Sequence, residues 1–148
     1  MADNPNILLH LMQEEWNHAR HLESQRSTMT NFIIIIAAGI QGFLAQKGFK
    51  VESLPLALVL FIIGVYGAIF SWKLEVIRMY HVDLALELRK RLSVLCPDSQ
   101  FEKISEEVGG RYRNRFLLWP GIPLWLLWVV LHSIFATLGL LYTGIILF

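Results

Sequence analysis

Apolar residues along the chain are concentrated in three long runs, and charged residues recur in the segments before and between them. The first run, 32–48, is interrupted only by two glutamines before Lys47, and the second, 54–72, contains no charged residue. A helix of about 20 mostly apolar residues crosses the hydrocarbon core of a bilayer. Because only a short segment joins the two runs, the pattern predicts a transmembrane helical hairpin over 31–72.

The third run, 116–148, contains no Asp, Glu, Lys or Arg. It is too short for two spans. Because proline suits the first turn of a helix, the spanning helix is expected to begin near Pro123. We therefore predict one transmembrane helix within 117–148.

The segment before the hairpin, 7–30, has the period of an amphipathic helix, with Asn6 as its expected N-cap. Its apolar stripe recurs at spacings of three and four residues: Leu9, Met12, Trp16 and Ala19. No glycine or proline separates this segment from the first apolar run. A single helix should therefore continue from the polar segment into the membrane.

The segment after the hairpin, 73–95, also lacks glycine and proline. Its stripe consists of Ile77, His81, Leu84, Leu88 and Leu95, with Leu92 alongside. Pro97 should end this helix, because proline disfavours helical backbone in the residue before it. A short amphipathic helix capped by Ser99 or Asp98 should follow and stop at the glycine pair 109–110.

These elements predict an all-α integral membrane protein with three transmembrane helices, the first two extended into the cytoplasm as an antiparallel helical pair. The expected divisions are a cytoplasmic amphipathic helix, the hairpin, a cytoplasmic stretch of two helices with a basic linker, and the third transmembrane helix: 1–30, 31–72, 73–116 and 117–148. The third division carries nine Lys and Arg residues, and the link within the hairpin carries two. Positive charge favours the cytoplasmic side, which places the N-terminus inside and the C-terminus outside a bacterial inner membrane.

The composition agrees with a membrane protein, with 55% hydrophobic and 17% charged residues, against about 45–50% and 25% in soluble domains. The net charge of +1 gives no sign of nucleic-acid binding. The single cysteine, Cys96, can form neither an internal disulfide nor a multi-cysteine zinc site. Phosphate-binding loops, metalloprotease motifs and serine-hydrolase motifs are absent from the sequence. We therefore expect no enzymatic activity, no cofactor and no metal.

Charged residues lie at matching depths beside the two hairpin helices. Glu23 and Arg26 precede the first run, whereas Glu75, Arg78 and His81 follow the second. With a rise of about 1.5 Å per residue, all lie within about 12 Å of the membrane boundary. If the helices pack antiparallel, Arg26 can meet Glu75. Glu23 can then meet Arg78 or His81.

Such a cluster of charged residues can fix helix register. It can also act as a switch, since histidine beside a carboxylate changes charge near neutral pH. The register function is favoured.

Four polar residues lie inside the predicted spans: Gln41 in the first, and His132, Ser133 and Thr137 in the third. A polar or ionisable group within a membrane span often marks a functional site, and for Gln41 that interpretation is pore lining. The alternative is hydrogen bonding to a neighbouring helix, which is a common packing device.

Two pairs of small residues, each four positions apart, lie within the hairpin: Ala38 with Gly42, and Gly64 with Ala68. Small residues on one helix face allow close backbone approach in lipid. Packing between the two hairpin helices is the favoured interpretation, and self-association between copies is the alternative.

Three arginines precede the third run: Arg111, Arg113 and Arg115. They could bind an anionic lipid head group or another anionic ligand. The favoured interpretation is a positively charged stop where the chain enters the membrane.

The layout of 15–95, together with the spacing Glu23-x-x-Arg26, resembles the SLATT-type membrane effectors. These are small bacterial proteins associated with nucleotide-signalled antiphage systems, and the resemblance implies a protein that forms pores in, or disrupts, the inner membrane. The chain departs from that layout by its third span, 123–148. It also shows no sensor domain, so a trigger would come from a separate soluble protein.

The sequence thus favours a homo-oligomer in the lipid bilayer that forms a pore or disrupts the membrane when triggered. The alternative is a non-conducting membrane anchor or adaptor whose cytoplasmic helices recruit a soluble partner. A membrane-embedded enzyme acting on lipid ranks last.

Overall fold

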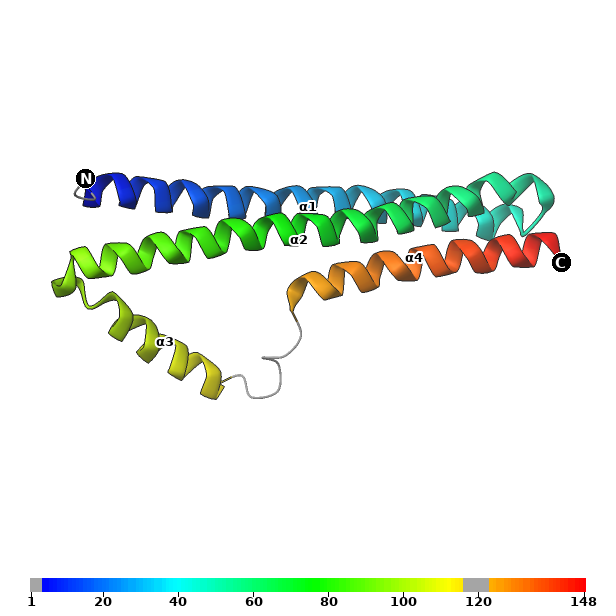
Figure 1. Ribbon diagram of the computed structural model, residues 1–148. Helices are drawn as coiled ribbons and strands as arrows, with labels where there is room; N and C mark the ends of the chain where they lie inside the picture. Colours follow the sequence, from blue (N-terminus) through cyan, green and yellow to red (C-terminus); the bar gives the residue numbers. More distant parts are fainter. Residues whose placement is uncertain (1–3, 116–122) are drawn as a thin grey trace. The chain divides into compact units, whose positions relative to one another are not determined.

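The computed structural model describes residues 4–115 and 123–148, and every regular element in these ranges is helical (Figure 1). The four α-helices are α1 (Pro5–Lys47), α2 (Leu54–Leu95), α3 (Phe101–Arg115) and α4 (Leu124–Leu147). Two short 3-10 turns, Val51–Ser53 and Pro97–Ser99, precede α2 and α3. The predicted all-α class is confirmed for the described residues.

Three of these helices, α1, α2 and α4, are long and apolar enough to cross a membrane. Their lengths are 43, 42 and 24 residues. The expectation that the polar segments continue the apolar ones without a break is confirmed, because α1 and α2 are each one uninterrupted helix. The third long helix begins directly after Pro123, where the sequence placed it.

The N-terminus of α1 is capped by Asn4, so the expected cap at Asn6 was wrong. The side-chain oxygen of Asn4 accepts a hydrogen bond from the backbone N–H of Asn6 at 3.0 Å. Pro5 then occupies the first helical position, where the missing N–H of proline costs nothing. The helix therefore starts two residues earlier than predicted.

The start and the end of α3 both differ from the prediction. The cap is neither Ser99 nor Asp98: both lie in a 3-10 turn, and Gln100 follows with a left-handed backbone, φ 49°. The helix also runs through the glycine pair 109–110 to Arg115. Glycine in a helix costs only about 1 kcal/mol per residue relative to alanine. The glycine pair therefore did not end α3.

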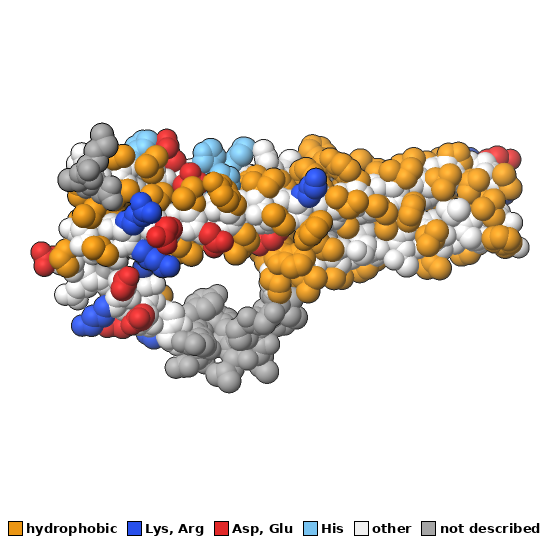
Figure 2. Space-filling view, viewed as in Figure 1, with side chains coloured by type: hydrophobic (Ala, Val, Ile, Leu, Met, Phe, Trp, Pro, Cys, Tyr) orange, Lys and Arg blue, Asp and Glu red, His pale blue; other side chains and the backbone are white. Residues whose placement is uncertain are grey.

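The chain divides into two compact units, which we describe separately. The polar unit comprises the described parts of Met1–Leu22 and Val76–Pro123, and the apolar unit comprises Glu23–Glu75 and Leu124–Phe148. Figure 2 shows charged and histidine side chains gathered on the polar unit, and hydrophobic side chains covering most of the visible face of the apolar unit.

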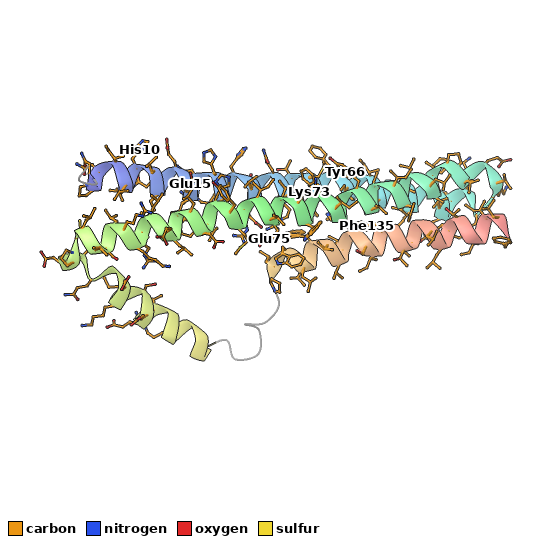
Figure 3. All side chains as sticks on the ribbon, in the orientation of Figure 1. His10, Glu15, Tyr66, Lys73, Glu75 and Phe135 are labelled. Carbon is orange, nitrogen blue, oxygen red and sulfur yellow. The ribbon has the colours of Figure 1, made fainter. Side chains whose placement is uncertain are left out.

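The core cluster of the apolar unit consists of apolar side chains from all three of its helices. Ala37, Ile40 and Leu44 of α1 are buried with Leu60 of α2, and Phe135 of α4 packs against them (Figure 3). Buried positions on α4 recur every seventh residue: His132, Gly139 and Ile146. This is the seven-residue repeat of interdigitating helices.

Glycines bring α2 and α4 into backbone contact. A methyl group at Gly64 would meet the Cα atom of Ala136 and the carbonyl oxygen of His132, each at 2.8 Å. A methyl group at Gly139 would lie 2.9 Å from the carbonyl oxygen of Ala57. Residue numbers rise along α2 as they fall along α4, so the two helices run in opposite directions.

The buried stripe of the polar unit is shifted from the predicted one. Leu8 is buried and Leu9 is exposed, although Met12, Trp16 and Ala19 lie on the buried side as expected. On α2, Ala85 and Leu92 are the buried positions. The predicted stripe residues Ile77 and Leu95 are 46% and 42% exposed. Apolar residues at adjacent positions satisfy the same periodicity, and only the facing helix decides between them.

Candidate functional site

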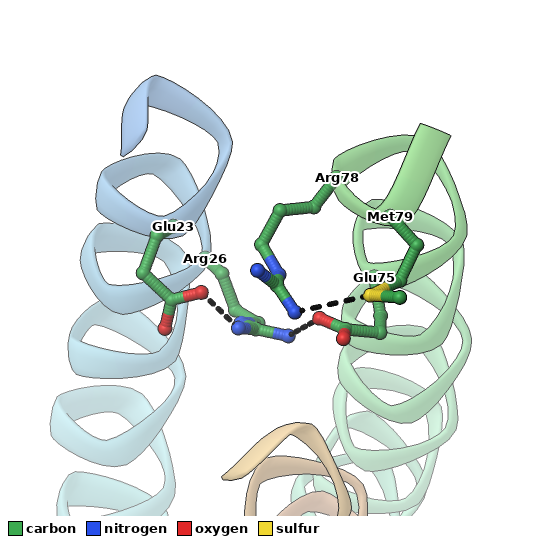
Figure 4. Close-up of polar contacts among 5 residues, drawn as sticks. All are labelled: Glu23, Arg26, Glu75, Arg78 and Met79. Atoms are coloured by element: carbon green, nitrogen blue, oxygen red, sulfur yellow. Dashed lines mark hydrogen bonds and ion pairs between the residues drawn. The ribbon is translucent and has the colours of Figure 1, made fainter. Parts of the chain in front are cut away.

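Arg26 lies at the centre of a charged cluster in the apolar unit (Figure 4). Its Nη1 donates a hydrogen bond to Oε2 of Glu75 on α2 at 3.0 Å, which confirms the predicted pairing of these residues. Its Nη2 binds Oε2 of Glu23, one turn earlier on α1. Arg26 thus joins two carboxylates.

Burial makes this cluster energetically important. Arg26 is 2% exposed and Glu75 is 7% exposed. Charges removed from water lose several kcal/mol of hydration, and their mutual attraction offsets that loss only when the geometry is good. The pair is therefore a poor source of net stability but a strong determinant of which helix positions face one another.

A second polar contact joins α1 to α4. Thr30 Oγ1 and His132 Nε2 lie 3.2 Å apart, and each residue is 1% exposed. The other ring nitrogen, Nδ1, is turned to Gly67 of α2, where an added methyl group would lie 2.6 Å from it. Nδ1 has no hydrogen-bond partner among the described residues. His132 therefore faces protein on both sides, which excludes it as a pore-lining residue of a single chain.

Apart from Ser53, the buried polar groups of the apolar unit share a simple pattern, and together we call them the buried polar layer. Each of the three helices contributes two residues that are four positions apart: Arg26 and Thr30 on α1, Ser71 and Glu75 on α2, and Trp128 and His132 on α4. Five of these residues are buried, and Trp128 is half-buried with a buried Nε1. Residues four apart lie on one face of a helix. The sequence analysis missed Thr30, Ser71 and Trp128, although the spacing from Arg26, Glu75 and His132 was visible.

His81 belongs to a different site, in the polar unit. Its Nδ1 lies 2.6 Å from Oε2 of Glu15, so Glu15 and not Glu23 is the carboxylate beside it. The ring of His18 stacks on the ring of His81 with 5.2 Å between centroids. Arg78, also in this unit, points one guanidinium nitrogen to the sulfur of Met79 at 3.4 Å. The predicted pairing of Glu23 with Arg78 stays a prediction.

The two predicted small-residue pairs have different surroundings. Gly64 packs on α4, and Ala68 is half-buried. Ala38 is exposed, and nothing lies within 4 Å of a methyl group built at Gly42. The favoured prediction, packing of both pairs between the hairpin helices, was therefore wrong, because Gly64 packs on the third helix and the pair Ala38 and Gly42 faces outward.

The remaining predicted polar residues lie on the surface of the apolar unit. Gln41 is half-buried, and Ser133 and Thr137 are exposed. The two hydroxyls donate to backbone carbonyls one turn earlier, Ser133 to Val129 and Thr137 to Ser133, each at 2.8 Å. Back-bonded hydroxyls of this kind need no partner from another helix.

Of the three arginines before α4, only Arg111 has a described side chain. It is exposed, and its Nε donates to the carbonyl oxygen of Glu107 at 3.4 Å. The side chains of Arg113 and Arg115 lie outside the described residues. The anionic-ligand hypothesis therefore stays a prediction.

The described part of the chain contains no group of three or more His, Cys, Asp or Glu side chains arranged to hold a metal ion. Comparison with known protein families, curated proteins and solved structures gave no match.

Proposed function

We propose that this protein is a small membrane protein that assembles with copies of itself and acts as a pore-forming or membrane-disrupting effector. The observation that carries the proposal is the outer face of α1, which we define as Asn31, Ile35, Ala38, Gly42 and Gln46. All five residues are exposed. They recur at spacings of four and three, so they lie on one side of the helix.

The composition of this outer face does not suit lipid. Its middle is formed by Ala38 and Gly42, and amide side chains stand at its two ends. Lipid offers no hydrogen-bond partners to amides, and small residues allow another helix to approach closely. A neighbouring face of the same helix exposes Phe32, Ile36 and Phe43, which are the bulky apolar side chains that lipid covers well.

A path for ions would run between copies and not through one chain. The dry core of the apolar unit fills the space among its three helices, and no polar side chain interrupts it between His132 and Tyr142. Gln41 and Gln46, on or beside the outer face of α1, are the amides that copies assembled around an axis would bring together.

The finer features of the proposal follow from charge and layout. α1 and α2 act as an antiparallel pair whose polar ends lie in the cytoplasm, because the basic residues cluster in 73–116. The resemblance to SLATT-type effectors adds the expectation of a role in antiphage defence at the inner membrane. A separate soluble sensor would supply the trigger.

The first test is the mass of the detergent-solubilised particle by native mass spectrometry. We expect a discrete oligomer of four or more copies for the wild-type chain, and a shift toward monomer for Gly42→Leu. The matched control is Ile36→Leu, which changes the lipid-facing side and should leave the mass unchanged. A wild-type monomer, or identical masses for both variants, would refute assembly through this face.

A second experiment tests contact between copies through the outer face in membranes. The chain has one cysteine, Cys96, so a Cys96→Ser background reports only introduced cysteines. Gly42→Cys should cross-link to a second copy under oxidation, and Phe43→Cys should not. Conductance across a planar bilayer then tests the pore, with loss expected for Gly42→Leu but not for Ile36→Leu.

The alternative function, a non-conducting anchor or adaptor, is favoured by one observation. The polar unit exposes large apolar side chains, with Tyr80 65% and Val94 79% exposed. Side chains of this kind are suited to a soluble partner. A stoichiometric partner that co-purifies from membranes and is lost in Tyr80→Ala, together with a monomeric particle, would favour the adaptor.

A further inference from the structure

Two buried hydrogen-bond donors in the buried polar layer have no acceptor among the described residues. One is Nε of Arg26, whose two other nitrogens bind Glu75 and Glu23. The other is Nε1 of Trp128 on α4. Both atoms can only donate. A buried donor without an acceptor is costly, and in folded proteins an enclosed water commonly explains it.

Helix register places these two donors at the same level. The contacts of Arg26 with Glu75 and of Ile33 with Gly67 show that α1 and α2 run in opposite directions. Because α2 and α4 also run in opposite directions, residue numbers rise together along α1 and α4. Arg26 precedes Thr30 by four residues, and Trp128 precedes His132 by four. Both residues therefore lie one turn from the contact between Thr30 and His132, in the same direction and at the same level.

We propose that one water molecule is enclosed between Arg26 and Trp128, accepting a hydrogen bond from Nε of the arginine and from Nε1 of the indole. Its own hydrogens go to carboxylate oxygens of the ion pair, since a carboxylate can accept about four hydrogen bonds. This water site is independent of the proposed assembly, because it lies wholly within one chain.

Burial and charge favour water over other hydrogen-bond acceptors at this site. Both donor atoms are inaccessible from outside, so a lipid head group does not reach them. A halide ion can only accept hydrogen bonds, and it would lie beside the carboxylates of Glu23 and Glu75. Water is neutral, and it both accepts and donates.

The test compares Trp128→Phe with Trp125→Phe, a matched loss of an indole one turn away on the same helix, by thermal unfolding of the full chain in detergent. If water is bound, Trp128→Phe loses a hydrogen bond, and its unfolding midpoint should fall by about 2–4 °C more than that of the control. If the site is empty, Trp128→Phe removes an unmet donor. A midpoint equal to or above that of the control would then overturn the proposal.

A second measurement probes the hydrogen bond of the Trp128 indole directly. The ultraviolet resonance Raman band that reports indole hydrogen bonding is recorded for the wild type and for Trp128→Phe, and the difference isolates residue 128. If that variant does not fold, a chain with Trp128 as its sole tryptophan serves instead. We expect a hydrogen-bonded band that is unchanged when gluconate replaces chloride. A free indole band would overturn the proposal, and a band that shifts with chloride would assign the site to a halide instead of water.

Discussion

The close approach of α2 and α4 at Gly64 gives a sharp quantitative test of the structure. Replacing Gly64 with alanine places a methyl group 2.8 Å from the Cα atom of Ala136 and 2.8 Å from the carbonyl oxygen of His132. Both are backbone atoms, so no side chain can rotate away and the helices must move. We therefore expect Gly64→Ala to separate α2 from α4.

The magnitude follows from a matched comparison with Gly39→Ala on α1, outside the outer face defined above. Nothing lies within 4 Å of a methyl group at Gly39. Both substitutions gain about 1 kcal/mol of helix propensity, so this gain cancels between them. Overpacking a tightly packed site costs about 1–3 kcal/mol. The free energy of unfolding should therefore be about 1–3 kcal/mol lower for Gly64→Ala than for Gly39→Ala, and backbone contact favours the upper end.

The assay is reversible unfolding of the full chain in mixed micelles, followed by far-ultraviolet circular dichroism. Gly139→Ala should behave like Gly64→Ala, since its methyl group would meet the backbone of Phe61 at 2.7 Å. If Gly64→Ala and Gly39→Ala differ by less than about 0.5 kcal/mol, a size typical of surface substitutions, then α2 and α4 do not touch through their backbones as described.

Three further predictions concern the polar contacts, each measured by the same unfolding assay. Arg26→Met should cost about 3–5 kcal/mol because the buried Glu75 carboxylate loses its ion pair with Arg26, and adding Glu75→Leu should recover most of that loss; no recovery would contradict the pairing. Thr30→Val should cost about 1–3 kcal/mol because the buried imidazole loses its hydroxyl partner, and an unchanged stability would show that the contact is not made. Glu15→Gln should cost at most about 1 kcal/mol because its ion pair with His81 is partly exposed, and a larger loss would mean that this pair is essential to the polar unit.

The contact between Arg26 and Glu75 could be predicted because helix geometry is regular. The two residues stand at similar distances from the ends of their apolar runs, and a constant rise per residue then sets them at one depth. The three long helices could be predicted for a related reason, since the length and composition of an apolar run determine whether it can span a bilayer.

The partner of His132 could not be predicted in the same way. Its helix follows a long connection, 96–123, so counting residues from the hairpin does not give its register. The choice between Leu8 and Leu9 was undetermined for another reason. Both are leucines at positions that satisfy the helical period, and the facing helix selects one of them. The helical period shows which positions can face a neighbouring helix, but it does not choose between two adjacent apolar residues.

The third long helix is part of the core and not an appendage to a two-helix hairpin. Without α4, Thr30 would lose its imidazole partner, and the glycine surface of Gly64 would be uncovered. Lipid cannot satisfy the hydroxyl, and it fills a glycine groove poorly compared with another helix. Because α4 already occupies this side of the hairpin, the assembly that we propose would have to use a different face. The outer face of α1, which includes Gly42, is the one whose small and amide side chains are suited to that contact.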